Sequence, residues 1–365
     1  MLITRSDRSN IALWWWTVDR LLLTSFFILI VFGIFLVMAS SQHIAESINI
    51  SSNYFTIRHF FFSLLSIPVI IFFSILNTRQ TKLLCILGFL ICICLLLFVL
   101  FEGEKIKGAQ RWLNIGNFSF QPSEICKPFY IIFNAWILTL WMEKKDFPGW
   151  AWSIGSILLL SALLLLQPDV GMTIVIIFTW GLQLFIAGLP VIVILCLILA
   201  FPIFMILAYR HFDHVRIRID NFIDGNTYQI TKSLQSFESG GLWGKGPGEG
   251  LYKKTLPDAH SDFIFAVAAE EYGVLICCLI IAIYGLIIGR SFLLTLKTEN
   301  LFFILAVSGL AFQLGFQSLI HMASNTDLIP PKGMTLPFLS YGGSSIIASA
   351  ITAGILLSLT RKKTF

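Results

Sequence analysis

Long apolar segments decide what this chain can fold into. A helix needs about 20 consecutive apolar residues to cross the hydrocarbon core of a bilayer, and the 365-residue sequence contains ten such runs. Of all residues, 57% are hydrophobic and 12% are charged, whereas about 25% are charged in a typical soluble domain. We therefore predict an all-α polytopic membrane protein with ten transmembrane helices. The predicted spans cover roughly residues 21–40, 59–76, 83–101, 123–142, 150–167, 170–188, 190–209, 263–289, 301–323 and 343–360.

Basic residues near the span ends indicate how the chain lies in the membrane. An even number of spans places both termini on one side, and short cytoplasmic segments are enriched in Lys and Arg. The total number of basic residues is nearly equal on the two sides, but the short segments favour cytoplasmic N- and C-termini in the cytoplasmic (inner) membrane. These short segments carry Arg79, Lys82, Lys144, Lys145, Arg361, Lys362 and Lys363.

Residues 1–365 then form a single membrane domain with two notable segments outside the bilayer. Residues 1–20 are predicted to be a cytoplasmic N-terminal segment, and residues 210–262 a large periplasmic loop between spans 7 and 8. Loops of this length are usually functional or disordered. Within this loop, Gly240–Gly250 is a Gly-rich turn region whose backbone is able to approach a ligand closely.

Composition and motifs argue against several function classes. The net charge of +5, from 25 basic and 20 acidic residues, is mild and forms no basic stripe, so nucleic acid is not an expected partner. The stretch Gly240–Gly246 has the wrong spacing for a phosphate-binding loop and lacks Ser or Thr after Lys245. We therefore expect no nucleotide cofactor. The seven cysteines lie in or beside apolar runs, where a disulfide framework is not expected.

Charged residues at the ends of spans are costly to place near lipid and are therefore candidates for function. The first cluster contains Lys107, Arg111, Glu124 and Lys127. Glu124 and Lys127 are three residues apart on a predicted helix, so they share a face and can pair. One interpretation is a capped helix with a neutralised ion pair. The other is a cationic shelf, where Lys107, Arg111 and Lys127 bind an anionic head group.

Further candidates lie in three other polar segments. Asp169 follows Pro168 between two spans and is expected either to cap the next helix or to face the same outer cavity. Arg216 and Arg218 alternate as on an extended or surface face, either as a solvated rim or as anion contacts. Ser344 belongs to the Pro- and Gly-rich stretch 327–345, which is either a re-entrant packing loop or one wall of a polar pocket.

Three carboxylates lie at the start of the predicted span 263–289. Asp262 sits at the water–lipid boundary, where it can serve as a helix N-cap, as a catalytic group, or as both. Glu270 and Glu271 lie eight and nine residues further on, which is about 12 Å deeper along a helix. We expect buried pairing for at least one of these glutamates, with Lys127 as a possible partner.

Five motifs follow one another along the chain: QRW…FQPSE…K (110–127), QPDVG (167–171), GGLWGKGPG (240–248), LPDAHSDFIFAVAAEEYG (256–273) and KGMTLPFLSYGGSS (332–345). In this order they resemble the motifs of the SEDS family, the shape, elongation, division and sporulation proteins. Within the family, the residues around Lys332 and Thr335 are more similar to the division branch than to the elongation branch. Departures from the family pattern occur at Lys232, Ser261, His321, Ala323 and Pro331, and they spare Asp262.

The resemblance implies a glycosyltransferase that polymerises lipid II into peptidoglycan glycan strands. It also implies a class B penicillin-binding protein and other division proteins as partners. By motif, Asp262 corresponds to the family's essential acidic residue, and Arg111, Glu124 and Lys127 match polar cavity positions. Physically, Asp262 would act as the base for an inverting transfer, with Glu270 as the fallback. Cationic side chains would offset the charge of the leaving pyrophosphate, together with a divalent cation such as Mg²⁺ or Mn²⁺.

Two other functions are consistent with the same spans. A lipid II flippase would use intramembrane charges equally well, but it needs a polar path through to the cytoplasmic face. A non-catalytic division scaffold would need no activity of Asp262 at all. The candidate polar residues gather at the outer ends of the predicted spans, which favours chemistry at the outer face.

Overall fold

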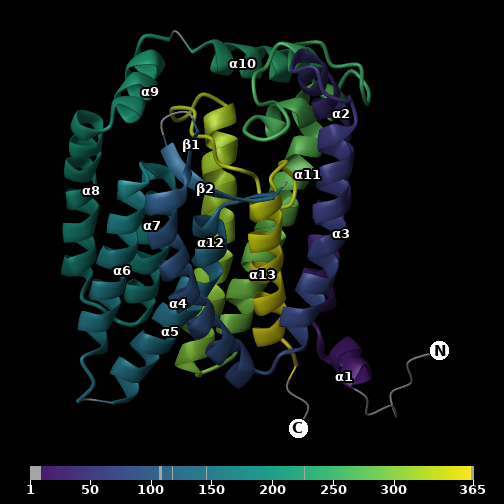
Figure 1. Ribbon diagram of the computed structural model, residues 1–365. Coiled ribbons are helices and arrows are strands. Elements are labelled where there is room, and N and C mark those ends of the chain that lie inside the picture. The colour runs from purple at the N-terminus through teal and green to yellow at the C-terminus, as the bar shows by residue number, and fades with distance from the viewer. Residues whose placement is uncertain (1–9, 107–108, 117, 145, 226, 363–365) are drawn as a thin grey trace.

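In the part of the chain that the structure describes, ten long helices form the body, and each overlaps one predicted apolar run (Figure 1). The computed structural model describes residues 10–362 except 107–108, 117, 145 and 226. The ten helices are α2 (Arg20–Ser47), α3 (Tyr54–Ile75), α4 (Thr78–Glu102), α5 (Pro122–Glu143), α6 (Gly149–Leu166), α7 (Val170–Ile186), α8 (Val191–His211), α11 (Ile264–Thr295), α12 (Leu301–Asn325) and α13 (Gly343–Leu359).

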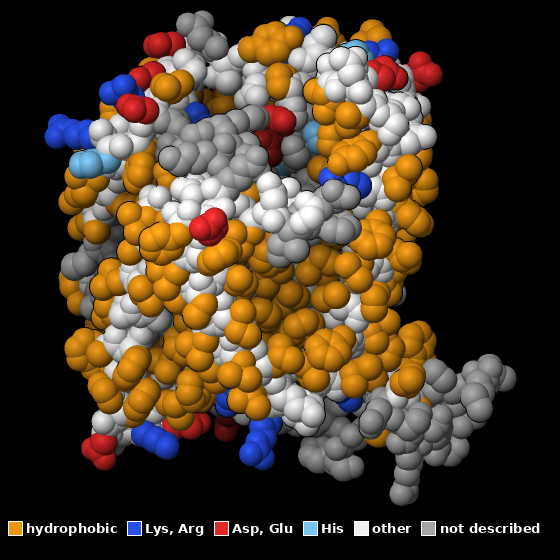
Figure 2. Space-filling model, in the orientation of Figure 1, with side chains coloured by type: hydrophobic (Ala, Val, Ile, Leu, Met, Phe, Trp, Pro, Cys, Tyr) orange, Lys and Arg blue, Asp and Glu red, His pale blue; other side chains and the backbone are white. Residues whose placement is uncertain are grey.

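Length and composition identify the protein as a polytopic membrane protein. Among the described residues, seven helices are long and apolar enough to cross a membrane, namely α2 to α6, α11 and α12. Three further apolar helices are shorter: α7, α13 and the Leu199–His211 part of α8. Figure 2 shows a broad hydrophobic band across this face of the bundle, with charged side chains gathered at its two ends. An apolar belt between two charged rims is the surface expected of a protein that spans a bilayer.

The segments between the helices are more ordered than the sequence predicts. Residues 104–120 form a small antiparallel sheet in the order β1 (Glu104–Ile106), β2 (Ala109–Ile115) and β3 (Phe118–Phe120), in which Leu113 pairs with Phe120. The predicted loop 210–262 contains two helices and one 3₁₀ turn: α9 (Asp213–Ile223), α10 (Tyr228–Gly240) and η1 (Tyr252–Lys254). The predicted N-terminal segment contains the short helix α1 (Asn10–Thr17). The predicted all-α architecture therefore holds for the helical body, and the segment 104–120 adds a small sheet to it.

The two ends of the bundle differ. We name the end that carries the sheet, α9, α10 and residues 326–342 the loop end, and the end that carries α1 and the last turn of α13 the terminal end (Figure 1). Between them α13 is buried along most of its length against α3 and α5. Gly354 permits this approach, because a Cβ there would lie 2.9 Å from the carbonyl oxygen of Ile70. Close packing through small residues replaces the hydrophobic effect as the force between helices in lipid.

The Gly-rich segment after α10 packs into a break in α11. Gly273 has a φ of 79°, which interrupts the helix. The freed backbone groups are satisfied by the neighbouring segment: Lys245 N–H donates to Glu270 O at 2.9 Å, and Val274 N–H donates to Gly241 O at 2.9 Å. A Cβ at Gly240 or Gly244 would clash with backbone atoms of α11. The expectation that these glycines approach a ligand is therefore wrong for both positions, because they approach a helix backbone.

Candidate active site

Asp262 lies in the turn that leads into α11, and hydrogen bonds from two neighbouring residues hold its backbone. Its N–H donates to Asp258 O at 2.9 Å. Its carbonyl oxygen accepts from Asn325 Nδ2 at 2.9 Å, while Asn325 Oδ1 accepts from Ala266 N–H at 3.2 Å. Asn325 is fully buried at the end of α12. The start of α11 and the backbone of Asp262 are thus tied to α12 through one amide side chain.

The loop between α12 and α13 provides the wall that the Asp262 side chain faces. Ser340 Oγ donates to Ser261 O at 2.6 Å, and Tyr341 N–H donates to His260 O at 2.9 Å. A Cβ added at Gly333 would lie only 2.8 Å from Asp262 Oδ2. The half-buried carboxylate therefore lies against the backbone of Gly333, and a side chain at this position would displace the carboxylate.

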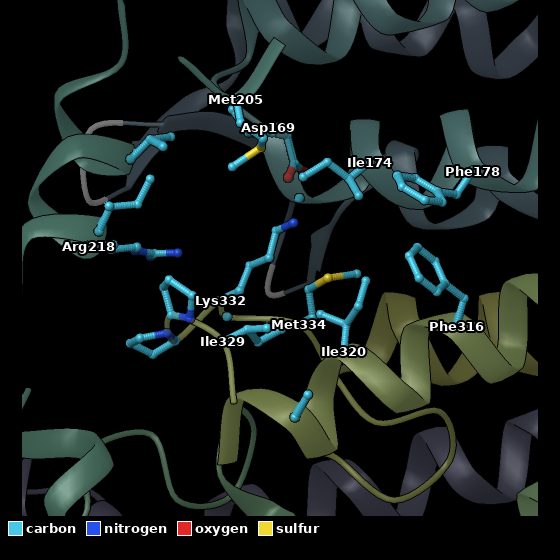
Figure 3. Close-up of a pocket in the computed structure, with 18 of the residues that line it drawn as sticks. Asp169, Ile174, Phe178, Met205, Arg218, Phe316, Ile320, Ile329, Lys332 and Met334 are labelled. Atoms are coloured by element: carbon cyan, nitrogen blue, oxygen red, sulfur yellow. The ribbon is translucent and has the colours of Figure 1, made fainter. Parts of the chain in front are cut away.

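A cavity of about 390 Å³ opens beside this wall, between α7, α8, α9, α12 and residues 329–334 (Figure 3). Its polar end is lined by Arg111, Asp169, Arg218 and Lys332. The rest of its wall is apolar and includes Ile174, Phe178, Phe201, Met205, Phe316 and Ile320. One hollow thus combines a charged end with a long apolar wall.

Arg111 and Asp169 form a fixed pair at the polar end. Arg111 Nη1 lies 3.6 Å from Asp169 Oδ1, and Arg111 Nε donates to Gln167 O at 3.1 Å. Asp169 also accepts from Met172 N–H at 3.3 Å, so the predicted cap of α7 is present. The two expectations for Asp169 are therefore compatible, because the capping carboxylate also lines the cavity.

Lys332 and Arg218 line the cavity. The sequence predicted Arg218 only jointly with Arg216, and it predicted Lys332 only as part of the stretch 327–345. Figure 3 shows the Lys332 amine directed toward Asp169 and the Arg218 side chain directed into the cavity. Burial lowers the pKa of Lys332 to about 8, opposed by Asp169 and reinforced by Arg218. Surrounding protein atoms likewise lower the pKa of Arg218, although its side chain is exposed at the rim; Asp262 opposes this shift.

Arg216 was predicted to be either a residue of a solvated rim or an anion contact, and it is not among the described residues that line the cavity. It pairs with Asp213 at 3.1 Å, and both side chains are exposed. The prediction of an extended segment placed residues 216 and 218 on one face. In the helix α9 two successive steps rotate a side chain by about 200°, so only Arg218 reaches the cavity. A helical periodicity in the sequence of α9 would have predicted that residues 216 and 218 lie on different faces.

Glu124, Lys127 and Ser344 lie in the helix interfaces rather than in the cavity wall, as far as the described residues show. Lys127 Nζ bonds Glu124 Oε2 at 2.7 Å, as the spacing predicts, and also Gln317 Oε1 at 2.6 Å. Ser344 Oγ accepts from Gln121 N–H at 2.9 Å and so supports the start of α5. Arg111 and Lys127 therefore do not form one shelf. Lys107, the remaining predicted member, lies outside the described residues.

Glu270 and Glu271 bind a segment of their own protein. Glu270 is fully buried and accepts three backbone hydrogen bonds, from Leu251, Tyr252 and Lys253, at 2.6, 2.7 and 2.9 Å. Glu271 forms an ion pair with Lys253. The predicted burial is correct, but the suggested partner Lys127 is wrong. This surrounding favours a structural role for Glu270 over that of a fallback base.

The cavity does not offer the ligands of a resident metal ion. Among the described residues, no group of three or more His, Cys, Asp and Glu side chains is placed to hold one. The two carboxylates at the polar end, Asp169 and Asp262, lie among the cations Arg111, Arg218 and Lys332. Such a donor set does not fit a divalent cation that is held by protein side chains alone. The expected Mg²⁺ or Mn²⁺ ion stays a prediction.

The fold and the cavity define a class: a polytopic membrane protein whose helix bundle holds a charged pocket with an apolar wall at one end. The family follows from the sequence comparison. The family of FtsW, RodA and SpoVE, described as "Cell cycle protein", matches residues 19–364, and the chain belongs to this family.

Similar proteins cover nearly the whole chain. "Probable peptidoglycan glycosyltransferase FtsW" of Caulobacter vibrioides is 38% identical over 98% of this chain and 93% of its own length. The protein of the same name from Coxiella burnetii is 32% identical over 94% of this chain and 96% of its own.

Solved structures with the same fold also cover most of the chain. A chain from "Structural coordination of polymerization and crosslinking by a peptidoglycan synthase complex" has a TM-score of 0.77 at 26% identity, over 94% of this chain and 97% of that chain. The rod shape determining protein RodA of Thermus thermophilus has a TM-score of 0.67 at 26% identity, over 95% of this chain and 97% of that chain.

Proposed function

We propose that this protein is a peptidoglycan glycosyltransferase that polymerises lipid II at the outer face of the cytoplasmic membrane during cell division. The observation that carries the proposal is the cavity, whose charged end and apolar wall lie beside Asp262. A lipid-linked sugar pyrophosphate has the same two parts. Its pyrophosphate suits Arg111, Arg218 and Lys332, and its polyprenyl chain suits the apolar wall. The names of the relatives support the same activity.

The proposed topology has ten spans with both termini in the cytoplasm, so that the loop end faces outward. Its support is that α1 and the end of α13 lie at one end of the bundle (Figure 1). Arg79, Lys82, Arg361 and Lys362 flank helix ends there, and short basic segments are typical of the cytoplasmic side. The sheet and α9 and α10 would then lie in the periplasm, where the cavity opens toward the outer leaflet.

The proposed reaction joins two lipid II molecules. Asp262 accepts the proton of the acceptor 4-hydroxyl as its oxygen attacks the anomeric carbon of the donor. The bond from that carbon to the pyrophosphate oxygen breaks, the electron pair leaves with undecaprenyl pyrophosphate, and the configuration inverts. A glycosidase needs a second carboxyl group to protonate a poor leaving group. Pyrophosphate is a better leaving group, so the cavity cations alone can offset its developing charge.

The cavity also separates this function from the alternatives. A flippase needs polar groups along a path through the membrane, whereas away from its charged end the described cavity is lined by apolar side chains, among them the contacting rings of Phe178, Phe201 and Phe316. A scaffold without activity gives no reason to hold three cations around a pocket beside a carboxylate. We further propose a class B penicillin-binding protein as partner, because a similar chain comes from a complex that coordinates polymerisation and crosslinking.

The direct test is lipid II polymerisation by the purified protein with its partner, comparing Asp262→Asn with Asp327→Asn. The first change is nearly isosteric and removes the base, so we expect a loss of about 10²–10⁴-fold in rate. Asp327 is exposed at the same end and has a positive φ of 61°, which Asn also tolerates, so this control should keep wild-type activity. Polymerisation by Asp262→Asn at the wild-type rate would refute the assignment.

A further inference from the structure

A cluster of aromatic and basic side chains lies on the α3 side of Asp262, away from the cavity. We propose that Phe55, Arg58, His260 and Tyr341 form the subsite for the head group of the acceptor lipid, while the cavity takes the donor. This inference rests on the proposed function and extends it by assigning the two substrates to different places.

The cluster is compact and open at one side. The ring centroids of Phe55 and His260 lie 4.6 Å apart, and those of Phe55 and Tyr341, and of His260 and Tyr341, lie 5.1 Å apart. Phe55 and Tyr341 are half-buried, and so is Arg58, whose guanidinium lies 5.2 Å over the Tyr54 ring. Figure 2 shows that this end of the molecule is hollowed, with acidic and histidine side chains recessed in the hollow. Ring faces beside a cation suit a sugar and an attached phosphate.

Buried polar atoms in the cluster point to a missing partner. Within the described part of the chain, no hydrogen bond reaches His260 Nδ1 or either ring nitrogen of His59, and these residues are only 7% and 1% exposed. An unsatisfied buried polar group costs about 1–3 kcal/mol, so such groups usually meet a ligand or water. Burial lowers the pKa of His260 to about 4, opposed by Asp258. The neutral ring can therefore donate to or accept from a sugar hydroxyl.

The positions of the two subsites bring both substrates to Asp262. His260 is two residues from Asp262, and its carbonyl oxygen accepts from Tyr341 N–H at 2.9 Å. On the other side, the Asp262 carboxylate touches Gly333, which lines the cavity. The helices that frame the two regions, α3 and α8, lie on opposite sides of the bundle (Figure 1). The base thus sits between an acceptor hydroxyl on one side and a donor anomeric carbon on the other.

The distribution of charge indicates that the donor binds in the cavity and the acceptor binds at the aromatic cluster. Negative charge develops on the pyrophosphate of the donor, which leaves, so the donor gains most from the cavity with Arg111, Arg218 and Lys332. The acceptor pyrophosphate keeps its charge throughout the step, and Arg58, whose guanidinium also donates to Tyr54 Oη, is the cation of this cluster that would bind it. Below Arg58, α3 exposes Ile57, Phe61 and Leu64, along which a polyprenyl chain can lie.

The test separates the two substrates chemically. One lipid II analogue has its GlcNAc 4-hydroxyl epimerised and serves only as donor. In the other analogue a methylene group replaces the anomeric oxygen, so the phosphonate cannot leave. This analogue serves only as acceptor. With both analogues, the holoenzyme and its partner should make a single tetrasaccharide lipid, and each half-saturation concentration can be measured while the other analogue is saturating.

We expect Arg58→Gln to raise the half-saturation concentration of the acceptor by about 10-fold or more and to leave that of the donor unchanged, because a hydrogen bond to a charged group is lost. Arg218→Gln should do the reverse, and Arg58→Lys should recover part of the acceptor binding. An unchanged donor constant also reports that the variant is folded. If Arg58→Gln shifts the donor constant or neither constant, the subsite is wrong. If the wild-type protein forms no product, the proposed function itself fails.

Discussion

Asp262 and Glu270 lie eight residues apart on one segment, yet their surroundings are opposite. Glu270 is fully buried, and its carboxylate is saturated by three backbone N–H groups. Asp262 is half-buried, faces Gly333 and lies near the cations of an open cavity. The same contrast separates Lys127, enclosed by Glu124 and Gln317, from Lys332, which lines the cavity. Charges that are enclosed by protein groups hold the fold, and charges that face the cavity remain available to a substrate.

The largest expected effect comes from filling the space in front of Asp262. In Gly333→Val the new side chain must displace the carboxylate, so we expect polymerisation to fall about 10²-fold or more. The displaced atoms are the end of a side chain, so the melting temperature should stay near that of the wild type. Gly181→Ala is the matched control, because a Cβ at Gly181 meets open space. Full activity of Gly333→Val would show that the carboxylate does not act from this position.

Substitution of an enclosed charge such as Lys127 should lower stability, whereas substitution at the cavity should lower activity. Lys127→Met leaves the buried Glu124 carboxylate without its cation, and breaking a buried pair costs about 3–5 kcal/mol. Thermal unfolding in detergent should therefore show a clear loss of stability, and the double variant with Glu124→Gln should recover part of it. Lys332→Met should slow polymerisation without this destabilisation. If the two lysine variants unfold alike, the distinction between enclosed and cavity-facing charges does not hold.

A pH profile sharpens the same contrast at Lys332. Burial lowers the pKa of Lys332 from 10.5 to about 8, so the amine is charged at pH 7 and neutral above about pH 8. Polymerisation should fall as the pH rises through 8, and Lys332→Arg should abolish that fall. Between about 8 and 10.5 the unfolded chain binds the proton and the folded chain does not, so the stability contribution of this residue rises with pH. Activity and this contribution should change in opposite directions; a profile that is flat through pH 8 would contradict the assignment.

Local features of the sequence predicted much of this molecule. The ten helices follow from apolar length alone, the Glu124–Lys127 pair from a spacing of three residues, and the cap at Asp169 from its position after Pro168. Each of these depends on residues that are neighbours in the chain. The helical body was therefore predictable, with helix ends that differ by up to seven residues.

Features that depend on distant contacts were missed. Lys332 lies near Asp169, from which it is separated by 163 positions in the sequence. Glu271 pairs with Lys253, which belongs to a segment that was predicted to be a loop. The orientation of Arg216 and Arg218 required knowing that α9 is a helix, although its sequence is too polar to be recognised as a span. From the sequence alone, the Gly-rich motif is equally consistent with a ligand-binding loop. Only the structure shows that it packs against the break in α11 at Gly273.

The most direct test of the cavity as the substrate site uses Arg216 and Arg218, two exposed arginines on one helix. Only Arg218 lines the cavity, while Arg216 pairs with Asp213. Lipid II polymerisation by the purified protein with its partner should fall about 10-fold in Arg218→Gln, as expected for one lost charge-assisted hydrogen bond, and should stay at the wild-type rate in Arg216→Gln. Equal rates for the two variants would contradict the account.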